Sequence, residues 1–166
     1  MKKVKIFIAC DTKSVKKMNN ILKDTQTNKL KIGYKIGLEF FFSKNGRVFI
    51  SKMKNKEIFL DLKLHDIPNT VHRASKVLGS LGVNYLTLHT SGGSEMMSAG
   101  VEGLLEGAKN AGIGAPVALG VTVLTSDPNT DEELMKQRIG VAKDSGCLGL
   151  VCSAHDLAIV SKQAPE

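Results

Sequence analysis

Three observations predict an α/β fold with parallel strands. Six apolar runs typical of strands recur along the 166 residues, and their starts lie about 25 to 34 residues apart. Each run is followed by a stretch with helical periodicity. The runs are nearly continuous in apolar residues, as expected for strands that helices cover. Strand and helix alternating at this spacing indicate repeated βαβ units and a parallel sheet.

The expected elements follow one another without a linker or a break in composition, which predicts a single domain over residues 1–166. In chain order, the expected strands are 4–10, 31–36, 58–64, 83–89, 117–123 and 148–153. The expected helices are 14–24, 38–54, 67–81, 92–110, 130–144 and 155–162. The candidate helix N-caps, whose hydroxyls could accept from the first turn, are Ser14, Thr130 and Ser153.

Two architectures fit this repeat, an open doubly wound sheet and a (β/α)8 TIM barrel. A doubly wound nucleotide site would need a glycine-rich turn after the first strand, and residues 11–14 contain no glycine. Polar residues instead stand at the end of almost every strand: Asp11, Lys35, Asp61, Lys63, His89, Thr125 and Ser153. Functional groups collected from successive strand ends favour the barrel. About six βα units are present, so the chain is expected to lack strands 7 and 8.

Charge and composition exclude several other classes of protein. The net charge is +7, but residues 1–60 hold 15 Lys or Arg against 4 Asp or Glu, whereas residues 61–166 hold 8 against 12. No nucleic-acid-binding motif accompanies the basic third, so its lysines are interpreted as solvated helix faces. No signal peptide or apolar span of ~20 residues is evident. The chain is therefore expected to be cytoplasmic and to bind neither nucleic acid nor membrane.

The stretch 61–70, Asp-Leu-Lys-Leu-His-Asp-Ile-Pro-Asn-Thr, carries the chemistry. Asp61, Lys63 and Asp66 place two carboxylates and an ammonium within six residues, at the end of an apolar strand. In a regular strand, residues i and i+2 project to the same side, which predicts that Asp61 and Lys63 do so. Charges at a buried strand end are costly unless they are paired. His89 is interpreted as a hydrogen-bonding residue behind the site, and the histidine spacing predicts no metal.

This stretch resembles the signature of orotidine 5'-phosphate decarboxylase. Four further segments resemble the same family in the same order: residues 9–11, 31–37, 86–93 and 121–126. The resemblance implies cofactor-free decarboxylation of orotidine 5'-monophosphate to UMP, the last step of de novo pyrimidine synthesis. Lys63 would protonate C6, Asp61 would orient Lys63 and press on the leaving carboxylate, and Asp66 would complete a charge network with Lys35.

The resemblance also implies contacts to the nucleotide and to a second subunit. Asp11 and Lys35 would contact the ribose hydroxyls, Thr125 the pyrimidine edge, and Ile67 would line the base pocket. Asp66 and Thr70 would reach the neighbouring active site, which implies a homodimer. The family's phosphate-gripping residues follow strands 7 and 8.

Three alternatives to this activity remain open. A Mg²⁺-dependent sugar-phosphate decarboxylase of the same suprafamily shares Asp-x-Lys-x-x-Asp, although the Ile-Pro-Asn-Thr continuation favours the orotidine enzyme. The chain could instead be an inactive truncated remnant. A nucleic-acid-binding role would depend on the basic first third alone.

Overall fold

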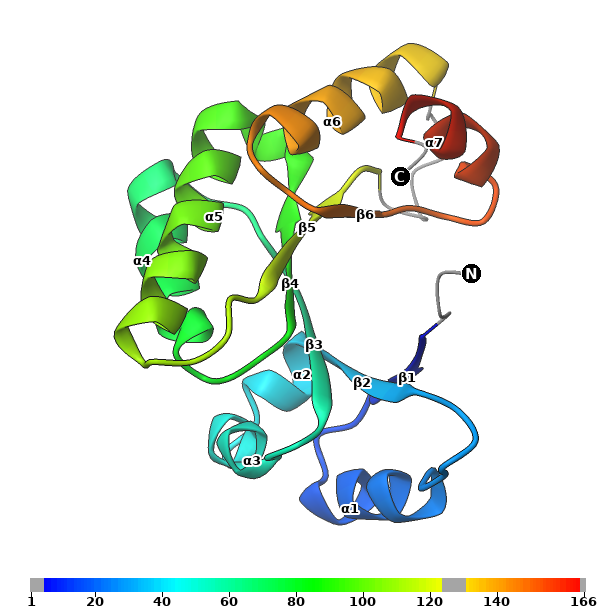
Figure 1. Cartoon of the computed structure of the whole chain (residues 1–166), viewed down its shortest axis with the longest axis vertical. Helices are drawn as coiled ribbons and strands as arrows, with labels where there is room; N and C mark the ends of the chain where they lie inside the picture. Colours follow the sequence, from blue (N-terminus) through cyan, green and yellow to red (C-terminus); the bar gives the residue numbers. More distant parts are fainter. Residues whose placement is uncertain (1–4, 124–130, 165–166) are drawn as a thin grey trace. The chain divides into compact units, whose positions relative to one another are not determined.

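The computed structural model describes residues 5–123 and 131–164, in two compact units that meet between Leu62 and Lys63 inside the third strand. Strands and helices alternate along both units (Figure 1). Each strand is an apolar run, and each connection back to the next strand contains at least one helix. This alternation produces parallel pairing, because a helical crossover returns the chain to the same edge of the sheet.

The first unit contains three strands and three helices. They are β1 (Ile6–Ala9), α1 (Val15–Asp24), β2 (Ile32–Gly37), α2 (Leu38–Phe41), α3 (Gly46–Lys52) and most of β3 (Glu57–Leu64). β2 pairs in parallel with β1 on one side and with β3 on the other. Ala9 lies opposite Lys35, and Gly37 lies opposite Asp61. The carboxyl ends of all three strands therefore share one edge.

The core of the first unit gathers apolar side chains from strands and helices. Its fully buried members include Met18, Ile36, Phe40, Ile50 and Leu60. The Ser14 hydroxyl accepts from the Lys17 N–H and caps α1, as predicted.

The single helix predicted for residues 38–54 is wrong, because the segment forms α2 and α3 with a turn between them. The Ser43 Oγ donates to the Phe40 carbonyl at 2.7 Å, which competes with the helical hydrogen bond at that carbonyl. A Cβ on Gly46 would lie 1.8 Å from the same oxygen. The tight turn therefore depends on local hydrogen bonding and on a glycine at residue 46, neither of which apolar periodicity reveals.

The second unit begins with the last residues of β3. It then contains α4 (Pro68–Gly79), β4 (Tyr85–His89), the 3₁₀ turn η1 (Thr90–Gly92), α5 (Gly93–Asn110), β5 (Val117–Val121), α6 (Glu132–Asp144), β6 (Gly149–Val151) and α7 (Leu157–Gln163). β5 pairs in parallel with both β4 and β6. Leu86, Leu88, Met96 and Leu104 are fully buried between β4 and α5. α6 and α7 enclose a smaller apolar cluster that includes Met135 and Val160.

Helices α4 and α5 lie side by side (Figure 1), and their backbones approach each other closely. A Cβ on Gly103 would lie 2.2 Å from the His72 carbonyl oxygen, and one on Gly107 would lie 1.9 Å from that of Lys76. On the other helix, a Cβ on Gly79 would lie 2.2 Å from the Leu104 carbonyl oxygen. Glycines on both helices thus permit an approach that any side chain would prevent.

The predicted fold class, α/β of the (β/α)8 TIM-barrel family with about six βα units, is confirmed by the six strands and by the structural likeness reported below. The cap predicted at Ser153 is wrong. Asp156 is the N-cap residue of α7, and Ser153 instead closes the preceding turn through the Asp156 N–H. The cap predicted at Thr130 lies outside the described residues, and Asp131 caps α6 through the Leu134 N–H.

Candidate active site

Three of the predicted site residues lie toward the carboxyl ends of the strands in the first unit. The Lys35 Nζ lies 3.3 Å from Asp61 Oδ2, and the two side chains are 29% and 11% exposed. Asp11 follows β1, and a Cβ on Gly37 would lie 3.8 Å from its Oδ1. The Asp11 carboxylate therefore borders the end of β2. Because ion pairing offsets desolvation, the ammonium of Lys35 lets Asp61 remain mostly buried near the end of an apolar strand.

Lys63 stands two residues further along β3 and has an unusual backbone. Its φ is +47°, within the left-handed region that a non-glycine residue rarely adopts and never as part of a regular strand. Such a conformation costs roughly 1–3 kcal/mol and persists only where the surroundings impose it. The rule that residues i and i+2 project together assumes extended backbone, so the argument that aligned Lys63 with Asp61 does not apply.

The backbone of Lys63 is hydrogen-bonded to a residue of β4. Its N–H donates to Thr87 Oγ1 at 2.8 Å, and the side chain of Thr87 is fully buried. Thr87 is a residue that the sequence analysis missed. The available signal was a polar residue in the middle of the apolar strand formed by Leu86, Thr87 and Leu88.

The segment that follows β3 presents the rest of the motif on the surface. Asp66 Oδ1 accepts from the Ile67 N–H at 2.7 Å, and α4 begins at Pro68, whose fixed φ suits the first helical position. Asp66 and Thr70 are exposed, and the side chain of Ile67 is 65% exposed although it is apolar. An exposed branched aliphatic side chain between two exposed polar residues is suited to contact with a ligand or a partner.

His89 ends β4 inside a small hydrogen-bonded cluster. Its Nδ1 lies 2.5 Å from Ser91 Oγ and accepts from the Ser91 N–H at 3.3 Å. The ring stacks on that of His65 with centroids 5.4 Å apart. Burial, followed by the charges of His65, Arg138 and Lys63, lowers the pKa of His89 below 6.5. His89 is therefore neutral at pH 7, and its contacts agree with the hydrogen-bonding role expected of it.

The cysteine at the end of β1 is chemically inert at neutral pH. Cys10 is fully buried, and burial together with the charge of Asp11 raises the pKa of its thiol to about 11. The reactive form of cysteine is the thiolate. Cys10 is therefore a packing residue beside the candidate site.

The structure thus brings Asp11, Lys35 and Asp61 to one strand edge of the first unit. In the second unit it places Lys63 against Thr87, with Asp66, Ile67 and Thr70 on the following loop and helix. The predicted pyrimidine contact, Thr125, lies outside the described residues.

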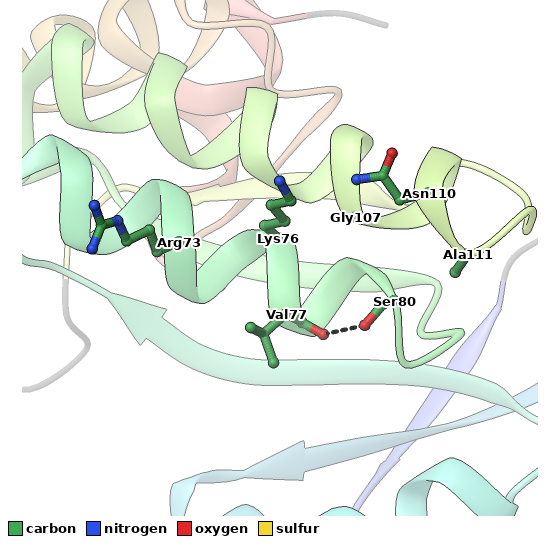
Figure 2. A pocket seen from close by; sticks show the side chains of 7 residues that line it. All are labelled: Arg73, Lys76, Val77, Ser80, Gly107, Asn110 and Ala111. Carbon is green, nitrogen blue, oxygen red and sulfur yellow. Dashed lines mark hydrogen bonds between the residues drawn. The ribbon is translucent and has the colours of Figure 1, made fainter.

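A pocket of about 480 Å³ lies between α4 and α5 of the second unit (Figure 2). It is lined by Arg73, Lys76, Val77, Ser80, Gly107, Asn110 and Ala111. The end of α5 leads into the amino end of β5, which places the pocket toward the amino ends of the strands. In βα barrels that side serves stability, whereas function resides at the carboxyl ends. The Lys76 ammonium there is already paired with Glu106 at 2.6 Å.

Two further features concern metals and membranes. Among residues 5–123 and 131–164, no three His, Cys, Asp or Glu side chains gather in a group that could hold a metal ion. Within the same described ranges, no helix combines the length and the apolar character that crossing a bilayer requires.

The fold and the strand-end charges define the class of protein, an α/β barrel-type enzyme whose ionisable groups stand at the carboxyl ends of parallel strands. A family model described as "Orotidine 5'-phosphate decarboxylase / HUMPS family" matches residues 4–165. The chain belongs to this family.

Curated relatives and a solved structure agree with that assignment. The chain is 40% identical to an orotidine 5'-phosphate decarboxylase of Ligilactobacillus salivarius, over 98% of this chain and 72% of that protein. It is 45% identical to one of Bacillus cereus, over 74% of this chain and 56% of that protein. The crystal structure of orotidine 5'-phosphate decarboxylase from Lactobacillus acidophilus superposes with a TM-score of 0.82 at 32% identity, over 95% of this chain and 75% of that one. The chain thus spans between about half and three quarters of the length of these relatives.

Proposed function

We propose that this chain acts, as a single catalytic domain, in the decarboxylation of orotidine 5'-monophosphate to UMP. The observation that carries the proposal is the stretch 61–70, complete in a chain that the family model matches over residues 4–165. The relatives at 40–45% identity bear the name of this enzyme. The pairing of Lys35 with Asp61 and the constrained backbone of Lys63 give further support, since both are arrangements that a merely structural strand end does not need.

The proposed chemistry assigns one task to each charge. Loss of CO2 from C6 of the orotate ring leaves an electron pair on that carbon, which the ring cannot delocalise. The Lys63 ammonium stabilises the developing negative charge and then donates a proton to C6. Asp61 disfavours the ground state by facing the substrate carboxylate. Asp66 completes the network of alternating charges with Lys35, and neither a metal nor an organic cofactor takes part.

Binding of the nucleotide falls to the neighbouring strand ends. Asp11 and Lys35 contact the ribose hydroxyls, Ile67 lines the base pocket and Thr125 contacts the pyrimidine edge. The exposure of Ile67 supports its role, because an apolar side chain that is 65% exposed gains from covering a base.

We also propose that the active form is a homodimer in which Asp66 and Thr70 enter the partner's site. Both are exposed here, on the loop and first turn that follow β3. Mixing two inactive variants, Lys63→Ala and Asp66→Ala, should restore part of the activity, because one site of each mixed dimer regains both residues. Mixtures as inactive as their components would contradict sharing of Asp66 between subunits.

The direct test is turnover of orotidine 5'-monophosphate by the purified chain in the presence of a metal chelator. We expect UMP formation that Lys63→Ala reduces by at least about 10³-fold, combining lost proton transfer and lost charge stabilisation. Lys136→Ala is the matched control, because that lysine pairs with Glu132 on the exposed face of α6. Turnover that survives Lys63→Ala, or the absence of both turnover and UMP binding, would contradict the proposal.

A sugar-phosphate decarboxylase is the second candidate, because the name of the matching family also covers the HUMPS group. The two differ in their metal requirement. Activity that needs Mg²⁺ and acts on a sugar phosphate would favour this second candidate.

A further inference from the structure

The strained residue Lys63 poses a question that its proposed chemistry does not answer. Among the described non-glycine residues, two have positive φ: Asn55 at +63° and Lys63 at +47°. Asn55 lies in the turn before β3, and asparagine tolerates the left-handed region because its side chain bonds locally. Lys63 lies within a strand rather than in a turn, and a lysine side chain does not favour the left-handed region as asparagine does. Something around it must impose the conformation.

A side chain of β4 contacts the Lys63 backbone. In a parallel ladder, an N–H donates to a backbone carbonyl of the next strand. The Lys63 N–H donates to the side-chain atom Thr87 Oγ1 at 2.8 Å, an ordinary strong geometry. Thr87 lies in the middle of β4, with a fully buried side chain.

Thr87 is well suited to hold this bond rigidly. Its β-branched side chain is stiff about χ1, and dense packing around a fully buried residue leaves few alternative rotamers. The bond fixes the plane of the peptide that joins Leu62 to Lys63. Rotation about the N–Cα bond of Lys63 then determines the direction in which its side chain leaves the strand, and that rotation is the one found at +47°.

We propose that Thr87 is a positioning residue for Lys63: its buried hydroxyl holds the plane of the peptide that joins Leu62 to Lys63, and so fixes the base from which the Lys63 side chain leaves the strand and the ammonium donates its proton. The inference depends on the proposed function for the proton transfer, but its structural part stands on the hydrogen bond and the backbone angle alone. A displacement of about 1 Å at a reacting group can reduce a rate ~10²-fold. A hydroxyl with no substrate contact can therefore govern the rate.

Three variants separate positioning from stability. Thr87→Val keeps the shape and removes the acceptor, whereas Thr87→Ser keeps the acceptor and removes a methyl group. Thr90→Val is the matched control. Thr90, the first residue after β4, is also fully buried, but its hydroxyl donates to the Val121 carbonyl at 2.8 Å rather than to a group of Lys63. Both valine variants replace a buried, hydrogen-bonded hydroxyl by a methyl group, and the Thr90 hydroxyl also lies 3.3 Å from the Thr122 carbonyl oxygen.

The first readout does not need turnover. The ammonium of Lys63 is followed by NMR of the ¹³C-dimethylated chain, assigned with Lys63→Arg, and the Lys63 amide is followed by hydrogen exchange. We expect Thr87→Val to move the Lys63 methyl signal and to speed exchange of the amide, Thr87→Ser to restore both, and Thr90→Val to change neither. A Lys63 signal unchanged in Thr87→Val would overturn the proposal.

The second readout is whether the substitution changes kcat or KM. Thr87→Val should lower kcat by about 10–100-fold and leave KM within about two-fold, and Thr87→Ser should recover most of kcat. Equal losses in Thr87→Val and Thr90→Val would mean that the hydroxyl serves folding alone. A wild-type chain without turnover would contradict the proposed function, while the NMR readout would still decide the role of Thr87.

If Thr87→Val does not fold, the wild-type chain still provides a test. The Lys63 amide is expected to exchange much more slowly than the exposed amides of the following loop. Rapid exchange would mean that the bond to Thr87 does not hold the peptide, and the proposal would fail.

Discussion

Two lysines near the carboxyl ends of neighbouring strands have different contacts. The ammonium of Lys35, two residues before the end of β2, pairs with Asp61, and the Lys35 backbone keeps the extended form of its strand. Lys63, at the end of β3, is held at its amide by Thr87, and its backbone is strained. The first arrangement fixes where a charge lies and tolerates a flexible stem. The second fixes the start of the side chain, which suits a group that must deliver a proton to one atom.

The largest effect on stability is expected in the second unit, which contains Lys63, at the contact between α4 and α5. Gly107→Ala would place a Cβ 1.9 Å from the Lys76 carbonyl, so the helices must separate. We expect a loss of about 1–3 kcal/mol in the free energy of unfolding, measured by urea denaturation. Gly140→Ala, in α6 with no atom within 4 Å of the added Cβ, should be neutral or stabilising by up to ~1 kcal/mol. Similar losses in both variants would contradict the close approach.

A double-mutant cycle measures how Lys35 is held. Lys35→Met and Asp61→Asn remove the two charges separately and together. The coupling energy is expected to be about 1 kcal/mol, because the Lys35 side chain remains partly exposed and solvent screens the pair. High salt should weaken the coupling. A coupling energy near zero would mean that the 3.3 Å contact does not hold Lys35.

The smallest expected effect concerns His89, which ends β4 two residues after Thr87. The pKa of His89 is lowered by burial first and then by His65, Arg138 and Lys63, so the folded state binds its proton less readily than the unfolded state. Stability should therefore be fully present above about pH 6.5 and fall as the pH drops through the unfolded pKa. His89→Asn should lose part of this acid sensitivity in urea titrations at pH 7.5 and 5.5. An unchanged slope would contradict the shift.

Local pattern predicted the strands and the charge cluster of residues 61–66, whereas the roles of the other site residues follow from the family resemblance and stay predictions. The apolar residues of 58–64 require burial, and charges at Asp61, Lys63 and Asp66 indicate an ion-pair network or a functional site at the end of that strand. The pairing of Lys35 with Asp61 was harder, because it depends on the register between β2 and β3. That register places Asp61 opposite Gly37, and no local signal encodes it.

The conformation of Lys63 could not be predicted at all. A lysine inside an apolar strand has every local reason to be extended, whereas Lys63 has a left-handed φ and an N–H bonded to a residue 24 positions later in the sequence. The prediction of one continuous helix over residues 38–54 was wrong for a related reason. There a side-chain hydrogen bond from Ser43 overrides a periodicity that continues through the turn.

One measurement tests most directly whether the backbone of Lys63 is strained by its left-handed φ. Lys63→Gly and Lys63→Ala both remove the side chain, but glycine adopts positive φ without strain. We predict that Lys63→Gly is more stable than Lys63→Ala by about 1–2 kcal/mol in urea unfolding. At Lys35, in extended backbone, the order should reverse, with glycine about 0.5–1 kcal/mol less stable than alanine. A chain in which alanine is as stable as glycine at residue 63 would contradict the account.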